Sequence, residues 1–216
     1  IVAVPVAGAI ALGGPIDTMQ LIQQEFPTGL SMAGNAPDTF TLVIGIVSAL
    51  AWGLGYFGQP HILVRFMAIS DAKELKKSTN IAMVWVVVSL VAAVLVGLVG
   101  HVYLQTPLEG TDVERVFLVM TADLFTSFVA GLIWSAVLAA IMSTASAQLL
   151  VTSSAISKDF YADFIHKGAS EKEQMIVSRA TVLLVAALAL YLALDPESYI
   201  LTMVAYAWAG FGAAFG

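Results

Sequence analysis

Residues 48–66, with the sequence SALAWGLGYFGQPHILVRF, combine two aromatic side chains with residues that weaken a helix. Trp52 and Tyr56 are four residues apart, so a helical turn between them places both rings on one face. Rings in that arrangement can flank a small solute, because their faces suit a cation and their edges carry a donor and a hydroxyl. The segment therefore has side chains suited to a small-solute site.

The same segment is a poor helix. Glycine occupies positions 53, 55 and 58, and Pro60 lacks a backbone donor and disfavours helix at Gln59. Backbone groups freed inside a bilayer need partners in protein, water or ligand, and transporters with broken helices use such groups to bind their solutes. A helix break within this span therefore suggests a cavity beside it. A packing face of small residues with an aromatic belt at the membrane interface is the alternative.

A second candidate site lies in the stretch SAVLAAIMSTASAQLLVTSS, which is rich in hydroxyls. Sodium is a hard cation and prefers oxygen ligands. Ser143 and Thr144 each carry a side-chain oxygen, and the carbonyl of Ala140 lies one turn earlier, free to face an ion if that turn is distorted. The alternative is that both hydroxyls donate back to carbonyls of the preceding turn, as Ser and Thr in helices commonly do.

The elements that must position these residues are long apolar helices. Charged residues punctuate the chain, and the stretches between them approach or exceed the roughly 20 residues of a membrane-crossing helix. No alternation typical of a transmembrane barrel occurs, so we expect an all-α polytopic membrane protein. The approximate spans are 1–16 (truncated), 39–60 (broken), 80–104, 124–157, 176–194 and 197–216 (truncated).

The composition agrees with a chain in lipid. The 216 residues are 59% apolar and 11% charged, with a mean hydropathy of +0.91, whereas soluble domains contain about 25% charged residues. The net charge of −6 argues against nucleic-acid binding. No cysteine is present, and no phosphate-binding, zinc-protease or nucleophile motif occurs, so we expect neither an enzyme nor a cofactor.

Loop charges predict the orientation. The five loops 17–38, 61–80, 105–123, 158–179 and 195–197 contain 0, 4, 1, 4 and 0 Lys or Arg residues in that order. Because Lys and Arg collect on the cytoplasmic side, the basic loops 61–80 and 158–179 are expected to be cytoplasmic.

Three segments carry a family resemblance. AWGLGYFGQPHILVRFMA, LAAIMSTASAQLLVTSSAISKDFY and SYILTMVAYAWAGFGAAFG resemble the sodium/proline symporters of the bacterial sodium:solute symporter family. The resemblance implies a LeuT-like core of two five-helix inverted repeats, of which this chain holds mainly the second. The chain begins with Ile and ends within an apolar stretch, so we expect an internal fragment that needs the first repeat of the same polypeptide.

The resemblance also implies a function. It implies sodium-coupled symport of L-proline across the bacterial cytoplasmic (inner) membrane, with Na⁺ as the coupling ion and no cofactor. Trp52, Tyr56 and Pro60 would line the proline pocket, and Ser143 and Thr144, with the carbonyl of Ala140, would contribute to the sodium site. Three alternatives remain open: symport of another small solute such as a different amino acid or pantothenate, a sensory input module of a histidine kinase, and a helical scaffold without a ligand.

Overall fold

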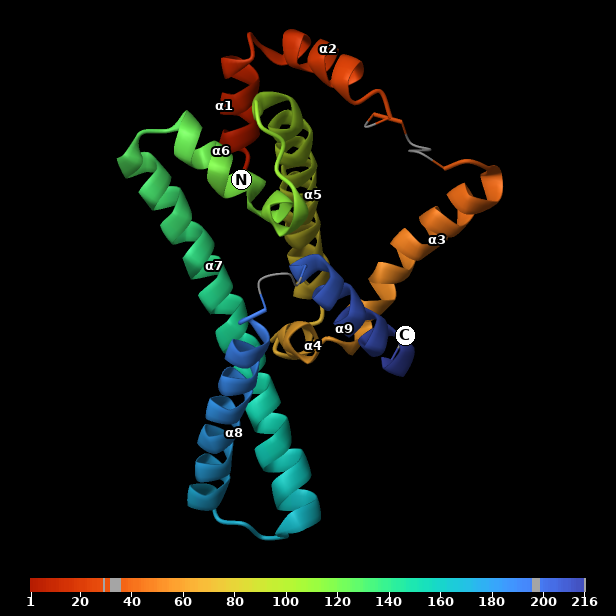
Figure 1. Cartoon of the computed structure of the whole chain (residues 1–216). Coiled ribbons are helices and arrows are strands. Elements are labelled where there is room, and N and C mark those ends of the chain that lie inside the picture. Colours follow the sequence, from red (N-terminus) through yellow and green to blue (C-terminus); the bar gives the residue numbers. More distant parts are fainter. Residues whose placement is uncertain (29, 32–35, 196–198, 216) are drawn as a thin grey trace.

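The computed structural model describes residues 1–28, 30, 31, 36–195 and 199–215, and all regular structure within them is helical. The chain is an all-α membrane protein. Figure 1 shows the helices in an open arrangement. The elements are α1 (Ala3–Ala11), α2 (Pro15–Glu25), α3 (Thr39–Gly55), η1 (Tyr56–Gly58), α4 (Pro60–Met67), α5 (Glu74–Tyr103), η2 (Gly110–Arg115), α6 (Val116–Leu124), α7 (Ser127–Ser154), η3 (Ala155–Ile165), α8 (Glu171–Leu192) and α9 (Ile200–Phe215).

Three of the described helices are long and apolar enough to cross a membrane. They are α5, the continuous run of α7 and η3 over Ser127–Ile165, and α8. The pair α3 and α4 adds a fourth span if the two helices are counted together. The run of α7 and η3 is 39 residues long, and α7 alone measures about 42 Å at 1.5 Å per residue. It therefore exceeds the roughly 30 Å hydrocarbon thickness and extends beyond the lipid if it stands upright.

Two of the predicted ranges contain more than one helix. Residues 1–16 contain α1 and the start of α2, separated by a turn in which Gly13 and Gly14 have φ of 100° and 121°. Residues 124–157 contain the end of α6, a break at Phe125 and Thr126, and a helix that continues past the range to Ile165. Charged residues such as Lys158 and Asp159 therefore lie within this long helix, because helical structure does not end where the apolar stretch ends.

A small apolar core joins α1, α5 and α6. Val4, Val96, Val99 and Met120 are buried there. Gly8 permits the close approach, because a Cβ at this position would lie 2.8 Å from Cγ1 of Val99 and 2.9 Å from Cε of Met120. The hydroxyl of Tyr103 donates a 2.5 Å hydrogen bond to Asp123, which also connects the ends of α5 and α6.

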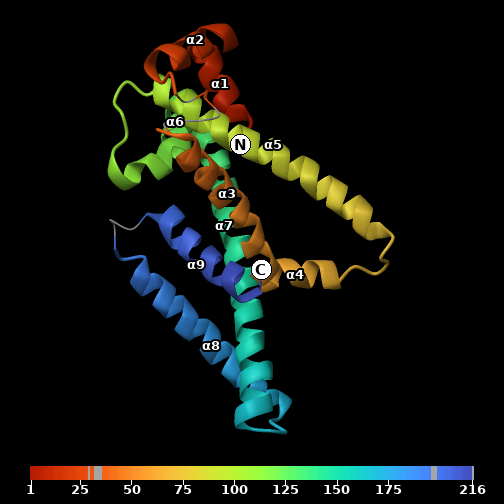
Figure 2. The same ribbon diagram turned by 90° about the vertical axis from the view of Figure 1, so that its right-hand side faces the viewer.

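The remaining helices lie in two groups. α7 and α8 contact each other, and both extend away from the core (Figure 1, Figure 2). α3 packs against α9, and η1 also contacts α9. Because these groups are splayed apart, large apolar faces are exposed. The accessible surface is 15711 Å², whereas a compact soluble monomer of this mass exposes about 9,500 Å².

The helix α3 has a defined start and a defined end. The carboxylate of Asp38 accepts a 2.6 Å hydrogen bond from the backbone N–H of Thr41, an N-cap that satisfies one of the free donors of the first turn. This hydrogen bond lowers the pKa of Asp38 below its usual value. The helix stays regular through Gly53 and Gly55, and then η1 and Gln59 separate it from α4, which is inclined by 57° to α3.

Candidate functional site

The three residues predicted to bind the solute all lie at the bend. Trp52 is in the last turn of α3, Tyr56 is the first residue of η1, and Pro60 is the first residue of α4. Gln59 has φ of −90° and ψ of 100°, the extended geometry that a following proline favours. The first helical position suits Pro60, since its missing N–H would have no partner there in any helix. The sequence thus places the break directly after the aromatic pair.

A third aromatic side chain, Trp208 of α9, completes the group. Its ring centroid lies 6.3 Å from that of Trp52, in a tilted arrangement, and 5.5 Å from that of Tyr56, edge to face. Both separations are typical of attractive aromatic pairs. The described structure therefore brings together three aromatic rings from two helices that are about 150 residues apart in the chain.

Glycine makes this approach possible. A Cβ at Gly55 would overlap the indole of Trp208, lying 2.8 Å from its Cγ, and a Cβ at Gly58 would lie 2.7 Å from the backbone oxygen of Phe211. Two glycines three residues apart on the bend thus face two residues three apart on α9. The glycines serve as contact points between helices as well as weak points of the helix.

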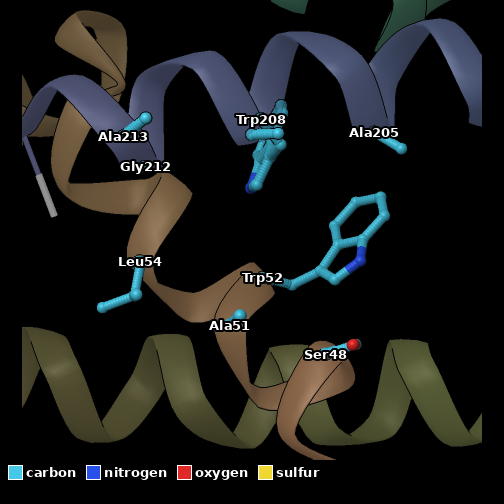
Figure 3. Close-up of a pocket in the computed structure, with 9 residues that line it drawn as sticks. Ser48, Ala51, Trp52, Leu54, Ala205, Trp208, Gly212 and Ala213 are labelled. Atoms are coloured by element: carbon cyan, nitrogen blue, oxygen red, sulfur yellow. The ribbon is translucent and has the colours of Figure 1, made fainter. Parts of the chain in front are cut away.

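A cavity of about 410 Å³ opens between α3 and α9, within the range of small-molecule sites. Figure 3 shows the rings of Trp52 and Trp208 pointing into it from opposite helices. Tyr56 and Pro60 do not line it, although Tyr56 contacts Trp208. None of the described residues that line the cavity is charged. Its lining residues are Ser48, Ala51, Trp52, Leu54, Ala205, Trp208, Ala209, Gly212 and Ala213.

Two buried nitrogen donors near the bend lack a hydrogen-bond acceptor within the described part of the chain. One is Nε1 of the Trp208 indole, and the other is Nε2 of Gln59, whose residue is 2% exposed. Buried polar groups are usually hydrogen-bonded, because an unpaired donor has lost its water without a replacement. Each is therefore a candidate contact for a group that the chain itself does not supply.

The predicted sodium residues lie on α7. Ala140, Ser143 and Thr144 are exposed, and the helix is regular through all three, so the backbone distortion considered for Ala140 is not present. The hydroxyls of Ser143 and Thr144 have no hydrogen-bond partner among the described residues. Other serines of α7 do bond back to carbonyls: Ser135 donates to Gly131 at 2.8 Å, and Ser153 donates to Leu150 at 3.0 Å. The back-bonded alternative therefore does not describe this pair.

The two candidate sites lie on different helices and do not share a cavity. The described residues that line the cavity belong to α3 and α9, whereas the hydroxyl pair lies on α7, which packs against α4, α6, α8 and η3. Within the described residues, no group of three or more His, Asp or Glu side chains is placed to hold a metal ion. The oxygens of Ser143, Thr144 and the Ala140 carbonyl are all neutral.

Comparison with known proteins identifies the family. The model of the sodium:solute symporter family matches residues 2–216. The chain belongs to the sodium:solute symporter family. No solved structure matches the chain.

Curated relatives in this family match the whole chain. It is 44% identical to the osmoregulated proline transporter OpuE of Bacillus subtilis (strain 168) and 45% identical to the high-affinity proline transporter PutP of the same organism. It is 43% identical to the sodium/proline symporter of Escherichia coli (strain K12). Each match covers 100% of the chain and 43%, 45% and 43% of the respective relative. The chain thus spans less than half the length of these symporter-family relatives.

The sequence reasoning missed the α9 wall of the cavity. Ala205, Ala209, Gly212 and Ala213 follow one another at helical spacing, a stripe of small residues along which another helix can approach. Trp208 lies within this stripe, and that combination was the available signal. The pattern does not say which helix approaches, so the contact with Gly55 was not predictable from it.

Proposed function

We propose that the protein to which this chain belongs is a sodium-coupled symporter that carries L-proline across the bacterial cytoplasmic membrane. The observation that carries the proposal is the 43% identity, along the whole chain, to a protein named as a sodium/proline symporter. The aromatic cavity beside the helix bend supports it, because a small uncharged pocket with aromatic walls suits a solute that combines an apolar ring with a cationic nitrogen.

The proposed solute site contains Trp52, Tyr56 and Pro60. Trp52 supplies a wall of the cavity, Tyr56 extends the aromatic surface through its contact with Trp208, and Pro60 starts the helix after the break. Free backbone groups near such a break can bind polar parts of a solute.

The proposed sodium site uses Ser143, Thr144 and the carbonyl of Ala140. Hydroxyls that are not engaged with their own helix can turn toward an ion, and the regular helix leaves the second lone pair of the Ala140 carbonyl available. The remaining oxygen ligands would come from the part of the protein outside this chain, since the α7 groups alone are too few to surround an ion.

We propose a LeuT-like core of two inverted repeats, in which this chain supplies mainly the second. The open arrangement supports an additional body of protein packing onto it, since the groups α3–α9 and α7–α8 leave most of their apolar surface exposed. The segments between α4 and α5 and between η3 and α8 would face the cytoplasm, because they belong to the basic loops.

Coupling would follow from linked binding. Sodium that stabilises the solute-binding arrangement raises the affinity for proline, and proline raises the affinity for sodium by the same factor. The membrane potential supplies about 2.3 kcal/mol per charge per 100 mV, so each sodium ion that enters the cell can drive accumulation of the solute.

The test is uptake of radiolabelled L-proline by the full-length protein in proteoliposomes. An inward sodium gradient should raise internal proline above equilibrium, whereas an equal potassium gradient should not. Equal uptake with both cations, or none with either, would contradict the proposal.

A further inference from the structure

Ser48 brings a hydroxyl to the cavity between α3 and α9. It lines this cavity together with Trp52, and its hydroxyl has no hydrogen-bond partner among the described residues. Hydroxyls on other helices, such as those of Thr121 and Thr181, donate back to a carbonyl of their own helix at 2.6 and 2.9 Å. Because lipid offers no hydrogen-bond partner, the Ser48 hydroxyl is available to a group that enters the cavity.

Trp52 presents a second polar group one turn later on the same helix. α3 is regular from Thr39 to Gly55, so residues four apart share a face and lie about 6 Å apart along the axis. Figure 3 shows the indole nitrogen of Trp52 and the hydroxyl oxygen of Ser48 on the same side of α3. Trp52 is 40% exposed, and its N–H has no acceptor among the described residues. One wall of the cavity therefore carries two accessible hydrogen-bond donors.

The chemistry of this pair favours a carboxylate. An indole N–H can only donate, whereas a hydroxyl can donate or accept. None of the described residues that line the cavity is a cation, so a carboxylate bound against this wall depends on neutral donors. Hydrogen bonds to an ionised acceptor are about twice as strong as those between neutral groups.

We propose that Ser48 binds the carboxylate of the transported solute together with the indole N–H of Trp52. This inference rests on the proposed function. The ring nitrogen of L-proline is a cation that only donates hydrogen bonds, so only the carboxylate can accept one from the indole. The Ser48 hydroxyl donates to the same group, and the face of Trp52 remains free for the cationic ring. Ser48 is accordingly a specificity-determining residue for solutes with a carboxylate.

The experiment measures how competitors inhibit sodium-dependent uptake of radiolabelled L-proline by the full-length protein in proteoliposomes. L-prolinamide keeps the ring and the cationic nitrogen but lacks the carboxylate, whereas (S)-tetrahydrofuran-2-carboxylate keeps the carboxylate and lacks the cation. Ser48→Ala removes the hydroxyl without adding bulk. It should weaken inhibition by unlabelled L-proline and by the ring-oxygen analogue about tenfold, and inhibition by L-prolinamide less than about threefold, because a neutral acceptor contributes less.

Three further variants separate the hydrogen bond from packing. Ser48→Thr retains the hydroxyl, so it should bind L-proline more tightly than Ser48→Ala. Trp52→Phe keeps an aromatic face without the donor and should lower the preference for L-proline over L-prolinamide in the same direction. Ser135→Ala is the matched control, since the Ser135 hydroxyl is bonded to Gly131 and its loss should change no competitor. An equal loss for L-proline and L-prolinamide in Ser48→Ala, or no loss for L-proline, would overturn the proposal.

The outcome also separates this inference from the function on which it rests. A wild-type protein without sodium-dependent proline uptake overturns the proposed function, and the inference with it. Normal wild-type uptake with an unchanged proline affinity in Ser48→Ala overturns the inference alone. If Ser48→Ala does not reach the membrane, Ser48→Cys replaces it under the same criteria, because a thiol is only a weak donor. If L-prolinamide does not inhibit the wild type, the ring-oxygen analogue decides, and its unchanged inhibition would overturn the proposal.

Discussion

At the scale of single residues, the hydroxyls of α7 divide into two kinds. Those of Ser135 and Ser153 donate to carbonyls of the preceding turn, whereas those of Ser143 and Thr144 have no partner among the described residues. A hydroxyl that donates to its own helix is held in one orientation, while an unengaged one can turn toward an ion. The proposed difference between these hydroxyls can be measured by substitution.

Ser143→Ala and Thr144→Ala should each raise the sodium concentration for half-maximal proline uptake about tenfold, which corresponds to the loss of about 1.4 kcal/mol of binding free energy. Ser135→Ala is the control, because its hydroxyl is bonded to Gly131 and should not affect sodium. Uptake kinetics at varied sodium in proteoliposomes give the comparison. A sodium dependence that stays at the wild-type value in both variants would contradict the site.

At the scale of helices, the contact between the bend and α9 depends on glycine. Gly55→Ala would place a methyl group inside the indole of Trp208, and the indole cannot move without losing its contacts with Trp52 and Tyr56. We expect less folded protein in the membrane and weaker proline binding. Gly45→Ala on the same helix, with nothing within 4 Å of the new Cβ, should be tolerated. Quantifying both variants by immunoblot and proline binding tests this, and equal behaviour of the two would count against the contact.

A second contact between elements fixes the start of α9. The carboxylate of Glu114 in η2 accepts hydrogen bonds from the backbone N–H groups of Ile200 and Leu201 at 3.1 and 3.0 Å. These are free donors of a helix N-terminus, where a negative charge is also favourable. Glu114 of η2 thus caps the N-terminus of α9 from a distant part of the chain.

Glu114→Ala should therefore loosen the first turn of α9. Hydrogen exchange followed by mass spectrometry should show faster exchange of the segment containing Ile200 and Leu201, with α5 unaffected. Glu109→Ala is the control, since this neighbouring carboxylate has no hydrogen-bond or ion-pair partner among the described residues. Protection of the α9 start that survives the loss of Glu114 would show that this cap is not needed.

At the scale of the whole molecule, the chain is a set of apolar helices with little internal core. The core at α1, α5 and α6 is small, and most large apolar side chains are exposed. Lipid and the rest of the protein would cover these faces, so the arrangement of loops relative to the membrane follows from the order of the spans. The absence of cysteine makes that order accessible to single-cysteine labelling.

A labelling experiment tests the orientation. Glu109→Cys, in the segment between α5 and α6, should react in intact cells with a thiol reagent that does not cross the membrane. Lys167→Cys, between η3 and α8, should react only after permeabilisation, because Lys and Arg remain on the cytoplasmic side. A full-length protein without other reactive cysteines is the background. The reverse pattern, or labelling of both from outside, would contradict the proposed topology.

The sequence alone predicted those structural features that depend on a single segment of the chain. Charge and apolar length predicted an all-helical membrane protein, and glycine with Pro60 indicated the weak stretch in which the break at Tyr56–Gln59 lies. Helix ends were less predictable: Gly13 and Gly14 end α1 early, and the helix of α7 continues through charged residues to Ile165. Contacts between distant helices, such as Trp208 against Gly55, could not be predicted because apolar α9 shows no preferred partner in its sequence.

Coupled movement of sodium and proline is tested most directly by driving sodium uptake with a proline gradient. Proteoliposomes containing the full-length protein, without a sodium gradient, receive an inward gradient of L-proline, and uptake of radiolabelled sodium is followed, with an equal gradient of mannitol as the osmotic control. We expect sodium uptake above the control that depends on L-proline and is reduced in Thr144→Ala. Proline entry without accompanying sodium would contradict coupled transport.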